Sequence, residues 1–521
     1  MPRLTINGHS ITVDPGTTIL DAARVAGIII PAMCNLKGLP HFTSCMVCVV
    51  QEKNSSRLLP SCSALATDGM VVETDTNEAR HVRTGSLSLL MSEHAGDCQA
   101  PCTTTCPAHM NIPLMIRQIA AGKPLEALTT VYDMIALPGV LGRICPAPCE
   151  KACRRGRIDA PLSICLLKRF SADDGAAGIS PPAHVSPSTQ HRVAIVGAGP
   201  AGLAAAFYLA QSGHACTIFD DHPHPGGQLR YGIPEYLLPS TVLDREIKHI
   251  HDLGVNFRMN TRVGSDIAFE DLKAGYDAII LTPGITSPDI LATWKVEFTP
   301  RGIKVDGHTF RSSDEKIFAG GEVIQAGHMA VRAVAHGKSM AISIDQFLGG
   351  LTVTGPPNRF ESRLGKIEAA EGQELMKEAS PHVRISPIDG PGTGFTQDEA
   401  IRESKRCMHC DCRKAEACKL RDYMEAHMTG PMHVPAEGRK PVERNITHPR
   451  VIFESGKCIK CGICVRITTH AGEKPGLAFL GRGFDAMVGV PFGASLEAGL
   501  GHSADQCVKE CPTGALAWKE L

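Results

Sequence analysis

The sequence predicts a multidomain protein in which cysteine-rich modules of α+β type flank one α/β domain. The length of 521 residues exceeds one ordinary domain of roughly 100 to 200 residues. The 21 cysteines are clustered, and Cys216 is the only one between Cys165 and Cys407. That interval contains a glycine-rich turn between a predicted strand and a predicted helix, which is typical of dinucleotide-binding domains.

Composition excludes several classes of protein. Lys and Arg number 53 and Asp and Glu number 54, so the net charge is −1 and offers no field of one sign for nucleic acid or anionic lipid. No apolar run reaches the roughly 18 residues of a membrane span, and residues 1–8 do not resemble a secretory signal. We therefore expect a cytoplasmic protein, in which dense thiols usually hold metal or carry out redox work.

Residues 1–80 predict a β-grasp domain with a metal cluster. Two short alternating strands in residues 4–13 join at Asn7-Gly8, a hairpin signal, and residues 17–26 have the pattern of an amphipathic helix. The cysteines that follow have the spacing C-x10-C-x2-C-x13-C, which is close to that of plant-type 2Fe-2S ferredoxins. The expected ligands are Cys34, Cys45, Cys48 and Cys62. A four-cysteine zinc site is the alternative.

Residues 81–175 predict a helical domain with two 4Fe-4S clusters. A first run has the form C-x3-C-x3-C-P, and two amphipathic stretches at 112–121 and 124–135 follow it. A second run again spaces its cysteines by x3. With one further cysteine, these runs supply seven thiols, which is nearly enough for two clusters: Cys98, Cys102, Cys106, Cys145, Cys149, Cys153 and Cys165.

Two known families share these motifs. IPAMC at 30–34, CMVC at 45–48 and DGMVVET at 68–74 resemble the ferredoxin-like N-terminus of the large iron–sulfur subunit of respiratory complex I. A second resemblance is to the N-terminal iron–sulfur domain of the glutamate synthase small subunit and of dihydropyrimidine dehydrogenase. It is carried by CPAHMNIP at 106–113, GRICP at 142–146 and LLKRFSAD at 166–173.

The second resemblance implies interleaved ligand sets, with Cys98, Cys102 and Cys153 on one cluster and Cys106, Cys145 and Cys149 on the other. Each set lacks a fourth ligand. We expect Cys165 to complete the second set, and a buried apolar cysteine is the alternative. His94 resembles the histidine ligand of the complex I subunit, and imidazole can replace thiolate on iron. A surface histidine is the alternative at that position.

Residues 191–350 predict a Rossmann-like domain, preceded by a linker at Gly175–Gln190. A strand ends at Gly197-x-Gly199-x-x-Gly202, which opens a helix, and the next strand ends at Asp220. This arrangement places a dinucleotide pyrophosphate on the helix N-terminus and a carboxylate on the ribose. Cys216, on the second strand, is expected to pack in the core.

The glutamate synthase small subunit also resembles this domain. PGGQLRYGIP at 225–234 and IFAGGEV at 317–323 resemble its FAD-contacting segments, although Glu322 stands where that family usually has Asp. The resemblance implies that FAD is bound. The expected contacts are Gly197, Gly199, Pro200, Ala201, Gly202, Asp220, Gly227, Gln228, Leu229, Gly232, Ile233, Gly321 and Glu322. A flavin fold that binds nothing is the alternative.

One part of that family's pattern is missing. The family inserts a second Rossmann unit for NADPH between the equivalents of Leu281–Gly284 and of the segment that begins at Ile317, whereas only residues 285–316 intervene here. An NADPH domain cannot fold in a connection of that length. We therefore expect the flavin to be unable to collect hydride from NAD(P)H bound by this chain.

Residues 396–521 contain two further cysteine motifs. The first indicates a 4Fe-4S cluster in preference to zinc, and His409 could replace one of its thiolates: Cys407, Cys410, Cys412 and Cys418. The second has three closely spaced cysteines and a remote Cys-Pro, a 4Fe-4S signature: Cys458, Cys461, Cys464 and Cys511. KCIKCGICVR, GRGF and CPTGAL around it again resemble the complex I subunit. Thr468 stands where a second cluster would need cysteine, and Cys507 is expected to be a spare thiol.

Together these expectations give a fold class that is multidomain α+β and α/β. It comprises a β-grasp 2Fe-2S ferredoxin domain, an α-helical two-cluster domain, a Rossmann-like FAD domain and a C-terminal ferredoxin-like 4Fe-4S region. The cofactors would be FAD, one 2Fe-2S cluster and about four 4Fe-4S clusters.

The mosaic resembles a linking subunit that relays electrons between partner subunits. A dehydrogenase, a hydrogenase or an NADH-oxidising flavoprotein could each be the partner, with no nucleic acid and no direct membrane insertion. Two alternatives stay open: an NAD(P)H-dependent reductase of the glutamate synthase type, and a noncatalytic electron wire or assembly scaffold with an empty flavin fold.

Overall fold

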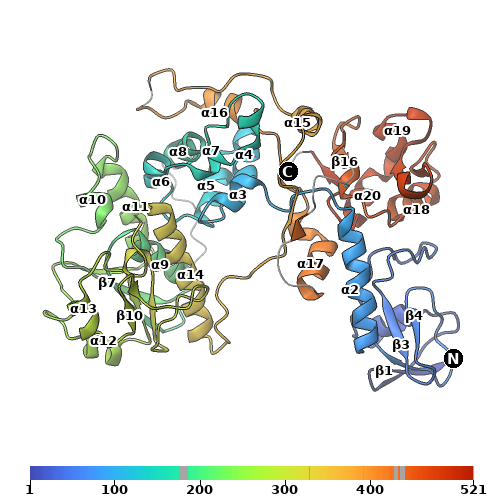
Figure 1. The fold of residues 1–521 in the computed structure, drawn as a ribbon, viewed down its shortest axis with the longest axis horizontal. Coiled ribbons are helices and arrows are strands. Elements are labelled where there is room, and N and C mark those ends of the chain that lie inside the picture. The colour runs from blue at the N-terminus through green and yellow to red at the C-terminus, as the bar shows by residue number, and fades with distance from the viewer. Residues whose placement is uncertain (175–185, 328, 391, 428–431, 434–440, 520–521) are drawn as a thin grey trace. The chain divides into compact units, whose positions relative to one another are not determined.

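The computed structural model describes residues 1–174, 186–327, 329–390, 392–427, 432–433 and 441–519. The chain divides into two compact units. Unit 1 comprises Met1–Ala100, Arg359–Ala379 and Met408–Leu521, and unit 2 comprises Pro101–Asn358 and Ser380–Cys407. Figure 1 labels their elements. Most of the predicted linker, residues 175–185, lies outside the described residues.

Unit 1 begins with a five-stranded mixed sheet of order β2-β1-β5-β3-β4. Its strands are β1 (Arg3–Ile6), β2 (His9–Thr12), β3 (Val49–Glu52), β4 (Arg57–Pro60) and β5 (Val71–Glu73). The predicted hairpin joins β1 to β2, and both Asn7 and Gly8 have the positive φ that a two-residue turn of this kind requires. Helix α1 (Ile19–Val25) follows, and the Thr18 hydroxyl caps it by accepting from the Asp21 N–H.

The remainder of unit 1 combines short helices with a small antiparallel sheet of order β15-β16-β19. This sheet and the helices beside it enclose one apolar core. In this part of the unit, two further pairs of strands, β13 with β14 and β17 with β18, form separate two-stranded sheets. The strands are β13 (Ser362–Arg363), β14 (Met432–His433), β15 (Arg444–Asn445), β16 (Val451–Glu454), β17 (Ala478–Leu480), β18 (Met487–Gly489) and β19 (Leu516–Trp518). The helices are α2 (Asn77–Ser92), α15 (Ala369–Met376), α17 (Lys419–His427), α18 (Ile463–His470), α19 (Leu496–Leu500) and α20 (Ala504–Glu510).

Unit 2 begins with a helical layer, as the sequence predicts. Its helices are α3 (Pro101–Thr105), α4 (Ile112–Ala120), α5 (Pro124–Tyr132), α6 (Pro138–Ile144), α7 (Pro148–Lys151) and α8 (Ile164–Asp174). Helix α16 (Gln397–Ser404) also belongs here. A buried network ties the α16 segment to this layer: the Arg155 guanidinium donates to the Arg406 carbonyl, and the Arg406 guanidinium donates to Asp159 at 3.1 Å.

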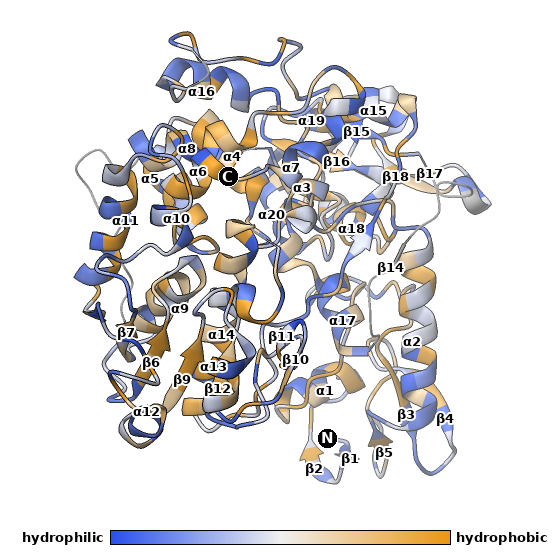
Figure 2. Ribbon diagram, turned by 60° about the vertical axis from the view of Figure 1, so that its left-hand side comes forward, coloured by the Kyte–Doolittle hydropathy of each residue, from blue (hydrophilic) through white to orange (hydrophobic). Residues whose placement is uncertain are grey.

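The second part of unit 2 is a parallel sheet of order β12-β9-β6-β7-β8. Its strands are β6 (Arg192–Val196), β7 (Ala215–Phe219), β8 (Asn256–Arg258), β9 (Ala278–Leu281) and β12 (Ile317–Ala319). Figure 2 shows hydrophobic colouring along β6 and β9, which suits strands buried on both faces. The strand order reverses beside β6, and open sheets of this kind bind ligands at the carboxyl ends of strands at such a switch point.

Helices cover the sheet and complete its core. They are α9 (Pro200–Gln211), α10 (Gln228–Tyr231), α11 (Ser240–Asp252), α12 (Phe269–Gly275) and α14 (Ala330–Leu348). Helix α14 packs closely on α9, because a Cβ at Gly337 would lie 2.4 Å from the Ala201 carbonyl oxygen. Cys216 on β7 is buried in this core, as predicted.

The connection from β9 to β12 is short. It contains one short helix, α13 (Pro288–Thr293), and a two-stranded hairpin, β10 (Phe298–Thr299) with β11 (Gly302–Ile303). Residues 282–316 are all described, and they contain no second parallel sheet and no second glycine-rich turn before a helix. Among the described residues of the whole chain, no helix is long and apolar enough to cross a membrane.

Candidate cofactor sites

The four N-terminal cysteines converge beneath the first sheet. All four are buried in unit 1: Cys34, Cys45, Cys48 and Cys62. The Cys34 thiol lies within hydrogen-bonding reach of Cys45 and Cys62, and Cys62 reaches Cys48, where its contact lowers the Cys48 thiol pKa to about 7. Their polar neighbours include the Thr43 hydroxyl, 3.9 Å from Cys62 Sγ, and the Ser61 hydroxyl beside Cys48. Four buried thiols linked in this way fit a four-thiolate centre.

A second set of thiols gathers inside the helical layer of unit 2. Cys145 contacts Cys165, and Cys165 contacts Cys149. Lys168, one turn after Cys165 on α8, is buried: burial alone would lower its pKa, but four cysteines raise it. Those cysteines are Cys165, Cys145, Cys149 and Cys106. A buried ammonium group among four thiols suits an anionic cluster at this point.

The other predicted helical-domain set is divided. Cys102 and Cys153 belong to unit 2, whereas Cys98 belongs to unit 1. The Cys407–Cys418 motif is divided as well, because Cys407 belongs to unit 2 and the three later cysteines to unit 1. Within unit 1, the N–H of Cys412 donates to the Cys98 carbonyl oxygen at 3.2 Å. The structure therefore brings Cys98 to Cys412.

His94 is not a surface histidine. It lies at the end of α2 with 7% of its surface exposed. Burial lowers its pKa to about 4, and the nearby Lys457 ammonium contributes in the same direction. The Nδ1 atom has no hydrogen-bond partner among the described residues. An imidazole that is buried, neutral and without a partner on one nitrogen has the state of a metal ligand.

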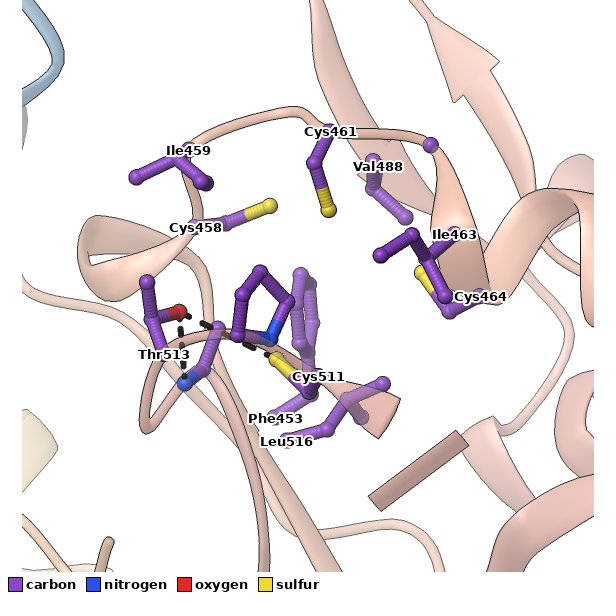
Figure 3. Close-up of a pocket in the computed structure, with 13 residues that line it drawn as sticks. Phe453, Cys458, Ile459, Cys461, Ile463, Cys464, Val488, Cys511, Thr513 and Leu516 are labelled. Carbon is purple, nitrogen blue, oxygen red and sulfur yellow. Dashed lines mark hydrogen bonds between the residues drawn. The ribbon is translucent and has the colours of Figure 1, made fainter. Parts of the chain in front are cut away.

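The C-terminal motif lines a pocket in unit 1. Figure 3 shows the sulfur atoms of Cys458, Cys461, Cys464 and Cys511 directed into it. The pocket contains about 330 Å³ that no atom fills, part of it open solvent, and its apolar walls include Phe453, Val488 and Leu516. The loop that carries the first three cysteines needs left-handed backbone at Lys460 and at Gly462. The four thiols fit a 4Fe-4S cluster by residue type and by convergence.

Thr468 stands where a second cluster beside this pocket would need a cysteine. The Thr468 hydroxyl lies 3.1 Å from the Cys464 carbonyl oxygen and accepts from the Leu477 N–H at 3.0 Å. Its polar atom is thus used within the fold. Cys507 on α20 is buried in the apolar core, with its sulfur 3.9 Å from the Cys464 carbonyl oxygen.

Arg466 joins the C-terminal motif to the N-terminal cysteine loop, both in unit 1. Its guanidinium donates to the Cys34 carbonyl oxygen at 2.7 Å and to the Cys461 carbonyl oxygen at 3.3 Å. It also lies over the Phe42 ring, which stacks on Phe479 with centroids 5.4 Å apart. The two candidate clusters are therefore neighbours, and sequence reasoning did not identify Arg466 or Lys168. The signal in the sequence that could have identified them is their position, because Arg466 follows Cys464 by two residues and Lys168 follows Cys165 by three.

The glycine-rich turn of unit 2 has the geometry that a dinucleotide needs. Gly197 has φ +105°, and a Cβ there would lie 2.3 Å from the Thr282 carbonyl oxygen. A Cβ at Gly202 would lie 2.0 Å from the Gly197 carbonyl oxygen, whereas a Cβ at Gly199 would meet nothing within 4 Å. The turn is therefore tight at two glycines and open at Gly199, where a pyrophosphate approaches the N-terminus of α9.

Three further predicted segments meet this turn at the carboxyl ends of the strands. Asp220, after β7, accepts from the Ala198 N–H at 2.7 Å. Gly227 packs so closely that a Cβ there would lie 2.9 Å from the Gly199 Cα atom. The Gly321 N–H donates to His336 Nδ1 at 3.1 Å, and a Cβ at Gly321 would lie 3.2 Å from the Ala201 side chain. These residues form a cradle around the start of α9, of which Pro200 is the first residue.

The other predicted FAD contacts lie near this cradle. Gln228 and Leu229 begin α10, and Gly232 ends it. Ile233 is half-buried against the core of unit 2. Glu322 lies in the single 3₁₀ turn Gly321–Val323 that follows β12. The residues present fit an FAD or another dinucleotide.

Three known families match successive parts of the chain. Residues 2–77 match the family described as 2Fe-2S iron–sulfur cluster binding domain. Residues 76–178 match the family described as dihydropyrimidine dehydrogenase domain II, 4Fe-4S cluster. Residues 195–260 match the family described as NAD(P)-binding Rossmann-like domain.

Several curated proteins are similar to parts of the chain. The NADPH-Fe(3+) oxidoreductase subunit beta of Geobacter sulfurreducens is 44% identical over 36% of this chain and 28% of its own length. The NADP(+)-dependent formate dehydrogenase subunit beta of Moorella thermoacetica is 42% identical over 36% of this chain and 29% of its own length. The NAD-dependent dihydropyrimidine dehydrogenase subunit PreT of Salmonella typhimurium is 35% identical over 46% of this chain and 61% of its own length.

The matched regions thus cover less than two thirds of each of these relatives. The chain has a 2Fe-2S domain, a helical 4Fe-4S domain and a Rossmann-like domain with a parallel sheet. In these regions the chain is similar to subunits of an oxidoreductase and of two dehydrogenases.

Proposed function

We propose that this protein is an FAD- and iron–sulfur-containing subunit that relays electrons between partner subunits and has no NAD(P)H domain of its own. The observation that carries the proposal is the connection from β9 to β12, which contains only α13 and the β10–β11 hairpin. A nicotinamide domain does not fit within a connection of that length. The dinucleotide cradle around α9 is then left for the flavin.

The proposed cofactors are FAD, one 2Fe-2S cluster and about four 4Fe-4S clusters. We infer that residues 1–80 are a β-grasp ferredoxin domain and that the C-terminal cysteine motif belongs to a ferredoxin-like region. The site at Cys34–Cys62 and the C-terminal site would be neighbours, because the Arg466 guanidinium donates to the carbonyl oxygens of both Cys34 and Cys461. A third site would lie beside the C-terminal one, because a Cβ at Gly514, three residues after Cys511, would lie 2.2 Å from Cys412 Sγ. Such a series suits stepwise transfer of single electrons.

The protein's part in this chemistry is to bind and to position the cofactors. A bound flavin exchanges two electrons with one partner and single electrons with iron–sulfur centres. Asp220 would hold the ribose, and the backbone N–H groups at the start of α9 would hold the pyrophosphate. The apolar walls of the C-terminal pocket, among them Phe453 and Val488, would limit water at that cluster.

The proposed partners are redox subunits, namely a dehydrogenase, a hydrogenase or an NADH-oxidising flavoprotein. Two of the relatives are named as beta subunits of an NADPH-Fe(3+) oxidoreductase and of a formate dehydrogenase, which supports a role inside a complex. Recovery of the protein with such a subunit from its native cells, under anaerobic conditions, would identify the donor. A chain that purifies alone and still reduces an acceptor with a soluble substrate would contradict the role.

The decisive experiment uses the isolated full chain, purified anaerobically. We expect close to one FAD per chain and iron and acid-labile sulfide in the amounts that the proposed clusters require. Dithionite should bleach the visible spectrum, whereas NADPH or NADH alone should leave it unchanged. Stoichiometric bleaching by either nicotinamide without a partner would contradict the proposal.

A second function has a specific observation in its favour. Residues 195–260 match a family described as NAD(P)-binding, and all three relatives carry NAD or NADP in their names. The alternative is therefore an NAD(P)H-dependent reductase of the glutamate synthase type. The same experiment separates the two functions, because direct bleaching by NADPH would support the reductase. Less than about half an FAD per chain would instead favour a noncatalytic scaffold with an empty flavin fold.

A further inference from the structure

We propose that His94, Cys98, Cys412 and Cys418 ligate one 4Fe-4S cluster in unit 1. Two segments far apart in the chain would then share a site. The family resemblance and the motif spacing instead group Cys98 with Cys102 and Cys153, and Cys412 and Cys418 with Cys407 and Cys410. The inference rests on the proposed function only in requiring that the chain hold 4Fe-4S clusters. All four side chains are buried.

The backbone brings the two segments together around Cys98. The Cys412 N–H donates to the Cys98 carbonyl oxygen at 3.2 Å, and the Cys98 N–H donates to the Ser362 carbonyl oxygen at 3.1 Å. The Ser362 N–H lies 3.4 Å from Cys98 Sγ and points to it as a donor. An N–H directed at a cysteine sulfur stabilises a thiolate bound to iron. Cys98 is thus held by residues of unit 1 on both sides.

Hydrogen bonds also bring the segment of Cys418 to the segment that holds Cys98. Arg421, three residues after Cys418, donates to the Phe360 carbonyl oxygen at 2.9 Å, and Phe360 lies two residues before Ser362. A Cβ at Gly514 would lie 2.2 Å from Cys412 Sγ, so this glycine leaves the space that the sulfur occupies. Three buried thiols held by the same segments suit one shared iron cluster.

His94 is the fourth donor. Its unpartnered Nδ1 lies in the same buried region, because the Ala95 N–H donates to the Gly456 carbonyl oxygen at 2.7 Å and the Lys457 stem packs against Gly96. Gly96 lies between His94 and Cys98 in the chain, and Lys457 acts on both His94 and Cys412. A buried nitrogen without a partner is costly unless something binds it.

The two neighbouring cysteines of the Cys407–Cys418 motif have other surroundings. Cys407 belongs to unit 2, where Arg155 holds the carbonyl of the preceding Arg406. Cys410 is only partly buried; it packs against a small core that includes Ala95 and Val442 and lies near the Arg444 guanidinium. Neither is included in the proposed set.

Iron counting on double variants tests whether Cys98 and Cys412 share a cluster. In the full chain, purified anaerobically, C98A and C412A should each lose roughly four iron atoms, the content of one 4Fe-4S cluster. The double variant C98A/C412A should lose no more than either single variant. A loss of about eight in the double variant would assign the residues to different clusters and overturn the proposal, as would a single variant that loses none.

Controls in the same unit show that the variants are folded. C507A removes a buried thiol outside the set and should keep all the iron. The 2Fe-2S signal in electron paramagnetic resonance should persist in every variant, because its four cysteines are untouched. If the wild-type protein itself holds no 4Fe-4S cluster, the proposed function fails. If the wild type holds the clusters and the double variant is additive, only the ligand set fails.

Spectroscopy tests the histidine. In reduced protein labelled with ¹⁵N-histidine, one 4Fe-4S signal should show a nitrogen coupling that disappears in H94C, while H94C keeps the iron because thiolate replaces imidazole. H94A should lose roughly the same four iron atoms as C98A. A nitrogen coupling that persists in H94C, or an H94A variant with full iron and an unchanged spectrum, would remove His94 from the set.

Discussion

Two glycine substitutions in one turn separate the fold of unit 2 from its capacity to bind a dinucleotide. Gly202→Ala places a Cβ 2.0 Å from the Gly197 carbonyl oxygen, whereas Gly199→Ala places one where nothing lies within 4 Å. The first change should destabilise the turn itself. The second should leave the turn intact and obstruct only a bound pyrophosphate, because the second glycine of this motif admits the phosphate to the backbone.

The size of each effect follows from these distances. Relief of a contact of 2.0 Å at Gly202 requires movement of the backbone by more than about 1 Å, and overpacking of this kind costs about 1–3 kcal/mol. Each kcal/mol lowers the melting temperature of a domain of this size by roughly 2–4 °C. Gly199 has φ −79°, which alanine adopts readily, so the free energy of unfolding should change by less than about 0.5 kcal/mol. Its FAD affinity should fall at least about tenfold, which corresponds to 1.4 kcal/mol.

The assay compares both variants with the wild type in flavin-stripped and reconstituted protein. Thermal unfolding of the stripped protein reports the fold, and FAD titration by fluorescence quenching reports binding. We expect Gly202→Ala to melt earlier with or without FAD, and Gly199→Ala to melt normally but to bind FAD weakly. Wild-type FAD affinity in Gly199→Ala would refute the reasoning, because the cradle would then not hold a pyrophosphate at α9.

Three further predictions concern single side chains. Burial raises the pKa of Glu246 to about 7, above its unfolded value near 4.5. The protonated carboxyl group therefore stabilises the folded state fully below pH 4.5, and about 3 kcal/mol of the free energy of unfolding should be lost between pH 4.5 and 7. In urea unfolding, Glu246→Gln should show a flatter dependence of stability on pH, and an unchanged dependence would contradict this pKa. Arg466→Gln should keep all the iron but lower the midpoint potentials of the clusters at Cys34 and at Cys461 by tens of mV in redox titrations. The reason is that a unit positive charge at about 10 Å, with an effective dielectric constant of about 20, stabilises the added electron by roughly 1.7 kcal/mol. Potentials equal to those of the wild type would show that Arg466 acts only in packing. Cys165→Ala should lose roughly four iron atoms. Cys216 is a buried cysteine of the same unit, and Cys216→Ala should lose none. Equal iron contents in the two variants would exclude Cys165 as a ligand.

Local signals in the sequence predicted several elements correctly. Asn7-Gly8 predicted the β1–β2 hairpin because only a few residues tolerate positive φ in such a turn. Apolar periodicity predicted α4 and α5, and the glycine spacing predicted the strand, turn and helix at Gly197. In each case the residues that determine the structure are close together in the chain.

Contacts between distant segments were not predictable in this way. The family resemblance groups Cys98 with Cys102 and Cys153, but the position of Cys98 depends on hydrogen bonds to Ser362 and Cys412. The motif from Cys407 to Cys418 reads as one site, yet Arg406 is held by residues of the helical layer through its buried ion pairs. A single sequence does not show which distant segments contact each other, because many segments carry residues that could form the same hydrogen bonds and ion pairs.

The discontinuity of unit 1 has a consequence for how the protein is made. Its residues before Ala100 leave the ribosome long before the segment after Met408 is synthesised. The Phe42–Phe479 stack and the Arg466 bonds to the Cys34 loop therefore form only after the segment that follows Met408 has been synthesised. Until then, the proposed site of His94 and Cys98 lacks Cys412 and Cys418, and its thiol is open to oxidation and to stray metal ions. Cells that produce this protein should need iron–sulfur delivery late in biosynthesis, and oxygen should be most damaging during that interval.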